Sequence, residues 1–165
     1  MAKYNDVIDL YEKYHYIGAG VAKFYIGCYY DNKLIACASI KKPTRQSSGD
    51  WEISRMVCNY NYKVHGLWSY ILKWITNNKL ISGKLITFSD NRLFNGKVYN
   101  KMGFCKDKDI KPDYYWTDNN KRYHKSALRK TNVEKKTGLT EIQLRHNQGF
   151  KRIFDYGKIK WSMVI

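Results

Sequence analysis

The sequence contains no apolar run near the roughly 18 residues that a membrane-spanning helix needs. Its first 14 residues mix charged and aromatic side chains and lack the apolar core of a secretory signal peptide. None of the four cysteines, Cys28, Cys37, Cys58 and Cys105, forms a CxxC pair, which excludes a zinc finger, and no ligand spacing demands another metal. We therefore expect a soluble cytoplasmic protein with reduced, buried cysteines and no required metal.

Acidic residues are scarce, with 14 against 30 basic ones, so that the 165-residue chain carries a formal charge of +16. Such an excess favours a polyanionic partner, because each neutralised phosphate releases a counterion. The chain also has 15 tyrosines and five tryptophans, and aromatic rings beside Lys and Arg can stack on unpaired bases. An ordinary basic surface over tyrosine-rich strands is the alternative.

Hydrophobic periodicity predicts alternating helices and strands, and thus an α/β fold with a mixed central sheet flanked by helices. We expect a domain at 1–130 and a basic aromatic extension at 131–165 that packs on it. The expected helices are 4–14, a helix starting near 67, 95–102 and 141–146; the expected strands are 24–30, 34–40, 51–58 and 84–89, with hairpins at 114–130 and 149–161.

The segment 86–104, ITFSDNRLFNGKVYNKMGF, places polar residues where a strand should end and a short helix should begin near Gly96. We expect this to bring Ser89, Asp90 and Tyr99 to one cleft. Asp90 could accept a proton or hold a base edge, or it could be a turn residue. Ser89 could bond a donor or be structural, and Tyr99 could be a proton source or pack in the core.

Two histidines and one arginine are further candidates. His15 titrates near neutrality and could act as a base or contact substrate, or it could simply bond a carbonyl at a helix end. Arg55, within an apolar strand, should either pair with a carboxylate or face a cleft and bind phosphate or donor. His65 could reach a donor or remain a solvated loop residue.

The run Val98-Tyr99-Asn100-Lys101-Met102-Gly103-Phe104 resembles the Tyr-x-x-x-Gly-Phe motif of the GNAT superfamily of N-acyltransferases. The resemblance implies a GNAT-like fold and assigns to Tyr99 the protonation of a leaving thiolate. It also implies that the segment 63–69, with Gly66 and Ser69, holds the donor's pyrophosphate. Trp68 stands there where the family has a small residue, and its indole would crowd the backbone. The expected donor is therefore either an acetyl-coenzyme A-like thioester or an aminoacyl ester such as aminoacyl-tRNA.

Several short segments together resemble the phage Mom-type DNA-modification proteins and the GNAT-like domains of phage homing-endonuclease-type proteins. They are His15-Tyr16, Arg55, Phe88-Ser89-Asp90 with Gly96 and Tyr99, the run 112–116 and the run 122–125. The resemblance implies transfer of a small acyl-derived group to adenine N6 in DNA, which protects the DNA from nucleases. For a phage protein the expected location is the host cytoplasm.

A paired adenine must leave the base stack before its N6 can react. We expect surface aromatics to hold such a base and basic residues to hold the DNA backbone, although some of these aromatics could fill a core instead. The expected nucleic-acid contacts are Tyr16, Tyr115, Trp116, Arg122, His124, Lys125, Arg129 and Lys130.

Three functions remain open from the sequence. The first is a DNA-modifying acyltransferase. The others are a non-catalytic DNA-binding module derived from such an enzyme, and an acetyl-coenzyme A-dependent acetyltransferase acting on tRNA, a protein or a small amine.

Overall fold

The computed structural model describes residues 1–43 and 48–165. The chain forms two compact units. Unit 1 comprises 1–89, 94–108 and 159–165, and unit 2 comprises 90–93 and 109–158. The boundary expected at residue 130 thus falls inside unit 2.

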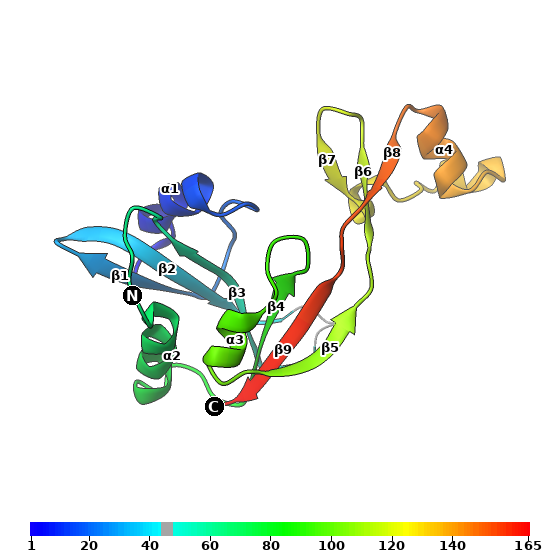
Figure 1. Ribbon diagram of the computed structural model, residues 1–165. Helices are drawn as coiled ribbons and strands as arrows, with labels where there is room; N and C mark the ends of the chain where they lie inside the picture. The colour runs from blue at the N-terminus through cyan, green and yellow to red at the C-terminus, as the bar shows by residue number, and fades with distance from the viewer. Residues whose placement is uncertain (44–47) are drawn as a thin grey trace. The chain divides into compact units, whose positions relative to one another are not determined.

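Unit 1 is built on a six-stranded sheet with the order β1-β2-β3-β4-β9-β5 (Figure 1). Its strands are β1 (Phe24–Tyr30), β2 (Lys33–Lys41), β3 (Trp51–Cys58), β4 (Lys84–Asp90), β5 (Cys105–Ile110) and β9 (Lys158–Val164). The first three strands are antiparallel, whereas β3 and β4 run parallel. The predicted α/β class, with a mixed sheet flanked by helices, is confirmed.

Helices cover both faces of this sheet. On one face, α1 (Tyr4–Tyr14) buries Val7, Leu10 and Tyr11 against Tyr25, Cys37 and Val57. On the other lie α2 (Leu67–Asn77) and α3 (Lys97–Lys101). The three-to-four spacing of the apolar residues in α1 and α2 gives each helix a single face to bury.

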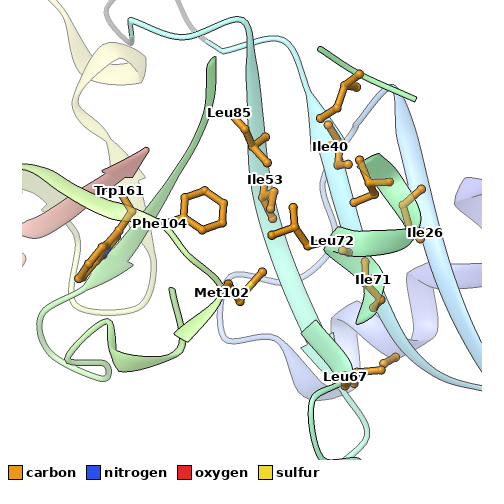
Figure 2. Packing of buried hydrophobic residues seen from close by; sticks show 14 residues of the cluster. Ile26, Ile40, Ile53, Leu67, Ile71, Leu72, Leu85, Met102, Phe104 and Trp161 are labelled. Carbon is orange, nitrogen blue, oxygen red and sulfur yellow. The ribbon is translucent and has the colours of Figure 1, made fainter. Parts of the chain in front are cut away.

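The larger core lies between the sheet and α2 (Figure 2). Ile71 and Leu72 of α2 belong to one buried cluster with Ile40 and Ile53 of the sheet. Leu72 lies beside Ile53, and Phe104 lies on the side of Trp161. Apolar burial of this extent is the main stabilising term for a domain of this size.

Unit 2 contains a smaller sheet with the order β7-β6-β8. Its elements are β6 (Tyr114–Thr117), β7 (Arg122–His124), β8 (Lys151–Phe154), the 3₁₀ turns η1 (Lys125–Leu128) and η2 (Glu134–Thr137), and α4 (Glu141–Asn147). Trp116 is fully buried at its centre. The nearly buried Arg145 of α4 donates to Glu134 at 2.6 Å and to the Leu128 carbonyl at 2.7 Å.

The predicted hairpin at 149–161 is wrong, because β8 pairs with β6 in unit 2 whereas β9 joins the sheet of unit 1. The expectation of buried cysteines is confirmed only for Cys37, because Cys28 and Cys58 are half-buried and Cys105 is exposed. Cys105 begins β5, a strand that the sequence did not predict. Within the described part of the chain, no helix has the length and apolar character needed to cross a bilayer.

Candidate functional site

The parallel strands β3 and β4 stay together over only a short distance. Their register joins Trp51–Ile53 to Leu85–Thr87, and among the described residues no β4 partner faces Ser54–Cys58. Ser54 is also an extra residue between two β2 pairs, because Ser39 lies opposite Arg55 and Ile40 opposite Ile53. Main-chain groups on one edge of β3 are therefore left for another partner as the strand reaches its carboxyl end.

The N-terminus of α2 follows β3 and is open. Gly66 caps it with φ +70°, no side chain among the described residues makes a capping hydrogen bond there, and its first turn has no acidic residue. Its chain neighbours aside, no atom of the described part of the chain lies within 4 Å of the position where a Cβ on Gly66 would stand. The exposed His65 and Ser69 flank it. The first N–H groups of a helix lack intrahelical acceptors and carry a partial positive charge, so this end suits an anion.

The sequence led us to expect that the Trp68 indole crowds the backbone at the start of α2, and the structure places this side chain elsewhere. Its half-buried side chain packs against the large core cluster. Packing of the indole against this core argues against the expected obstruction of the helix end.

Tyr99 projects from α3 into the same side of the sheet. Its ring contacts Phe104 and Trp161 with centroid separations of 6.0 Å, and its hydroxyl donates to the Phe88 carbonyl over a long 3.4 Å. Burial raises the pKa of Tyr99, with a smaller opposing effect from Thr87. A phenol is already protonated at neutral pH, and the raised pKa extends the protonated form to higher pH, so Tyr99 can serve as a proton source.

Ser89 and Asp90 sit differently at the end of β4. Ser89 is 1% exposed, and its Oγ accepts a 2.9 Å hydrogen bond from the Trp161 indole. Asp90 is 9% exposed, and its carboxylate accepts the Arg92 N–H at 2.9 Å, which is turn geometry. Ser89 thus shares a Trp161 contact with Tyr99, whereas Asp90 belongs to unit 2.

His15 and Arg55 form a separate cluster on the α1 face. The Arg55 guanidinium Nε donates to the Gly18 carbonyl at 2.8 Å. Burial, and to a lesser degree the charge of Arg55, lowers the pKa of His15 to about 4. His15 Nδ1 accepts the Ile17 N–H at 3.3 Å, so the neutral ring carries its proton on Nε2. In this tautomer His15 offers a donor rather than a base. Tyr16 stacks on its ring at 5.2 Å.

The structure therefore brings together only part of the expected constellation. His65, Gly66 and Ser69 gather at α2, while Arg55 lies with His15 on the opposite face of the sheet. Sequence reasoning missed Trp161, which is far from Ser89 and Tyr99 in the chain yet bonds the first and contacts the second. Ile159, Trp161 and Met163 are two residues apart in the last strand and therefore share one face, and this spacing was the signal that could have predicted packing of Trp161 in the core.

The structure also places the expected nucleic-acid contacts of unit 2 in different environments, some buried and some exposed. Trp116 is 0% exposed, so its indole cannot stack on a base in this structure, and the expectation of a surface position is corrected. Tyr115, Arg122 and His124 lie on the open sheet face. Lys125 pairs with Asp113, the half-buried Lys130 bonds the Leu139 carbonyl, and the side chain of Arg129 is exposed.

No family model and no curated protein matches the chain. Among solved structures, it is similar to a GNAT family acetyltransferase from Elizabethkingia anophelis with acetyl-CoA bound, at 19% identity and a TM-score of 0.47, over 84% of this chain and 74% of the other. It is also similar to an N-acetylglutamate synthase from Neisseria gonorrhoeae complexed with coenzyme A and N-acetyl-glutamate, at 15% identity and a TM-score of 0.42, over 82% of this chain and 24% of the other. Similarity at this level assigns neither a family nor an activity to the chain.

Proposed function

We propose that the chain is an N-acyltransferase whose activated acyl donor binds at the carboxyl ends of β3 and β4. The observation that carries this proposal is the early end of their parallel pairing, after Ile53 and Thr87. Each strand is followed by a helix that begins at a glycine with positive φ, Gly66 before α2 and Gly96 before α3. Carboxyl ends of parallel strands are common ligand sites, because loops and helix N-termini converge there.

The residues at this edge fit a donor with an anionic part. The open N-terminus of α2 would hold phosphate groups through its main-chain N–H groups and dipole. Both donors inferred from the sequence, a coenzyme A thioester and an aminoacyl-tRNA ester, carry phosphate. Such a donor would supply an activated carbonyl carbon. Main-chain groups of Ser54–Cys58 on the edge of β3 away from β2 would orient the rest of it.

Tyr99 is the residue to which we assign proton transfer. Its hydroxyl is protonated at neutral pH, and the raised pKa keeps it so at higher pH, until the bond from the acyl carbon to the leaving sulfur or oxygen breaks. Tyr99 then gives its proton to that atom. It recovers one from the acceptor amine, whose nitrogen is now bonded to the acyl carbon, so protons balance over one turnover.

For the acceptor we propose the N6 amine of adenine in DNA. Support comes from the charge of +16 and from a half-buried tyrosine at the end of α1 beside an exposed one after β3. Tyr60, 79% exposed, meets Tyr14 edge-on at 5.0 Å, and Lys13 lies 5.4 Å from the Tyr14 ring centre. Such rings can hold an unstacked base while lysines hold phosphates.

Nucleoside mass spectrometry tests this function. DNA and tRNA from bacteria expressing the wild type, Tyr99→Phe or Tyr29→Phe are digested to nucleosides and compared. Tyr29 is an exposed tyrosine of β1, outside the proposed donor site, and makes a matched control. We expect an added mass on deoxyadenosine with the wild type and the control but not with Tyr99→Phe. A mass found only in RNA would move the acceptor to RNA, and an unchanged product from Tyr99→Phe would remove Tyr99 from the chemistry.

A non-catalytic DNA-binding module is the second candidate. The observation in its favour is that the Ser89 hydroxyl bonds Trp161 and the Tyr99 hydroxyl points to the Phe88 carbonyl. Absence of any new mass, together with salt-dependent DNA binding by the purified protein, would support it.

A further inference from the structure

One face of the small sheet in unit 2 is open. The register places Tyr115 opposite His124 and Ile153, and Thr117 opposite Arg122 and Lys151. Cross-strand partners share a face, so these side chains form one surface, here called the platform. The platform consists of Tyr115, Thr117, Arg122, His124, Lys151 and Ile153. Four of these residues are exposed and the other two are half-buried.

The opposite face of the same sheet is occupied. Trp116 points there and is fully buried, with the His146 ring of α4 edge-on at 6.2 Å. Tyr123, its neighbour on β7, meets Phe150 at 5.6 Å. The core of unit 2 thus lies on that side, and the platform is not needed to bury it.

The platform holds a stacked pair of side chains. The Arg122 guanidinium carbon lies 3.6 Å from the centre of the Tyr115 ring, and the exposed His124 ring meets Tyr115 edge-on at 5.8 Å. His124 Nδ1 is hydrogen-bonded to the Ser126 hydroxyl at 2.6 Å. Contact with Tyr115 fixes the plane of the guanidinium, whose outer side can accept a second flat group.

The charge of the platform has one sign. Arg122 and Lys151 are cationic, and none of the six platform residues is acidic. Asp118, in the turn between β6 and β7, directs its carboxylate to the Lys121 N–H at 2.7 Å and to the Tyr123 hydroxyl at 2.8 Å. Lys151 Nζ makes a long 3.5 Å contact with the neutral Asn119 side chain. The positive charge of the platform therefore complements an anionic ligand.

We infer that the platform binds single-stranded nucleic acid. An unpaired base would stack on the outer side of Arg122, and adjacent phosphates would pair with Arg122 and Lys151. A duplex keeps its bases stacked inside and offers this surface only phosphates. An acidic peptide would satisfy the charges but would gain nothing from the planar Tyr115–Arg122 stack. This binding goes beyond acyl transfer and does not depend on it.

The test is fluorescence anisotropy of the full chain with labelled oligothymidylate of about 12 nucleotides, within the usual site size, and with a duplex of equal length. The variants are Arg122→Gln/Lys151→Gln and, as a control, Lys135→Gln/Lys136→Gln, which removes the same charge from exposed positions of η2. We expect the platform variant to bind the single strand about tenfold or more weakly, with a salt slope smaller by about 1.4 for two lost phosphate contacts. The control should change affinity less than about twofold.

Arg122→Lys separates stacking from charge. Lysine keeps the positive charge but has no planar group, so we expect weaker single-strand binding with an unchanged salt slope. The inference would be overturned if Arg122→Lys bound the single strand with wild-type affinity. It would also be overturned if the two double variants lost equal affinity, or if the duplex bound more tightly than the single strand. If the protein forms no acylated product but still binds the single-stranded oligonucleotide through the platform, the inference holds although the proposed acyl transfer fails.

Discussion

At the scale of single residues, burial holds two titratable groups of unit 1 in their neutral forms. It raises the pKa of Tyr99 and lowers that of His15 to about 4. At neutral pH the first is therefore a proton donor and the second an uncharged ring with its proton on Nε2. The proposed chemistry gives the proton transfer to Tyr99 and leaves His15 a positioning role at most.

Tyr99→Phe should separate catalysis from stability. The hydrogen bond from the Tyr99 hydroxyl to the Phe88 carbonyl is long, at 3.4 Å, so its loss should leave the melting temperature nearly unchanged. Loss of the leaving-group acid should lower kcat by about a hundredfold or more. Release of free thiol from an acyl-thioester donor measures kcat, and thermal unfolding measures the melting temperature. A variant that is unstable and still active would reverse both expectations.

His15 should make stability depend on pH. In the folded state it stays neutral down to about pH 4, whereas in the unfolded chain it takes up a proton near pH 6.5. The unfolded state thus binds more protons in this window, and the free energy of unfolding falls as pH drops from 6.5 towards 4, by at most about 3 kcal/mol for this partly exposed ring.

Urea unfolding at pH 7.5 and pH 4.5 measures that change. His15→Gln cannot take up the proton, so its stability should fall less between the two pH values than that of the wild type. Equal falls in both proteins would show that His15 does not carry the effect.

At the scale of elements, both helices on the site face begin at a glycine in the left-handed region. A Cβ on Gly66 would meet no atom of the described residues beyond its chain neighbours, whereas a Cβ on Gly96 would run into the Trp161 ring. The two positions share a backbone conformation and differ in packing. They therefore separate backbone strain from steric overlap.

Substitution by alanine should reveal that difference. Gly66→Ala should cost about 1 kcal/mol through positive φ alone. Gly96→Ala should cost about 2–5 kcal/mol, because displacement of Trp161 is added to the same strain. Urea denaturation of both variants measures this order, and a larger cost at Gly66 would contradict the described packing.

Periodicity predicted most elements of unit 1, because their apolar faces are the faces that pack. The helix 4–14 and the strand 51–58 have the expected bounds. By contrast, β5 reads CKDKDI and is mostly exposed, so no apolar alternation marks it. The last two strands were assigned to each other because they are adjacent in sequence, yet each pairs with a different sheet. The polar segment 86–104 marked Tyr99, but its Trp161 neighbour depends on contacts distant in sequence.

At the scale of the whole molecule, the chain divides into two units with separate cores. Arg145 organises part of the second, donating to Glu134, Gln148 and the Leu128 and Arg129 carbonyls. The hydrogen bond from Arg145 holds the pKa of Glu134 at about 2. A single buried guanidinium thus ties α4 to the loop before η2.

Arg145→Gln should loosen unit 2 selectively, because it leaves these carbonyls and Glu134 without their donor. Hydrogen exchange followed by mass spectrometry should show about tenfold or faster exchange in β6–β8 and α4, with the strands β1–β3 still protected. The exposed Arg129→Gln serves as the control. Uniformly faster exchange in both units would show that they unfold together.

The central claim is that an acyl donor binds where β3 and β4 part. Hydrogen exchange with and without acetyl-coenzyme A tests it most directly, because binding should slow exchange of the main-chain N–H groups concerned. The account predicts new protection in Ser54–Cys58 and in the first turn of α2, at Leu67–Ser69, whose N–H groups precede the first intrahelical bond, from Tyr70 to the Gly66 carbonyl. Protection confined to other segments, at donor concentrations that saturate the protein, would contradict it.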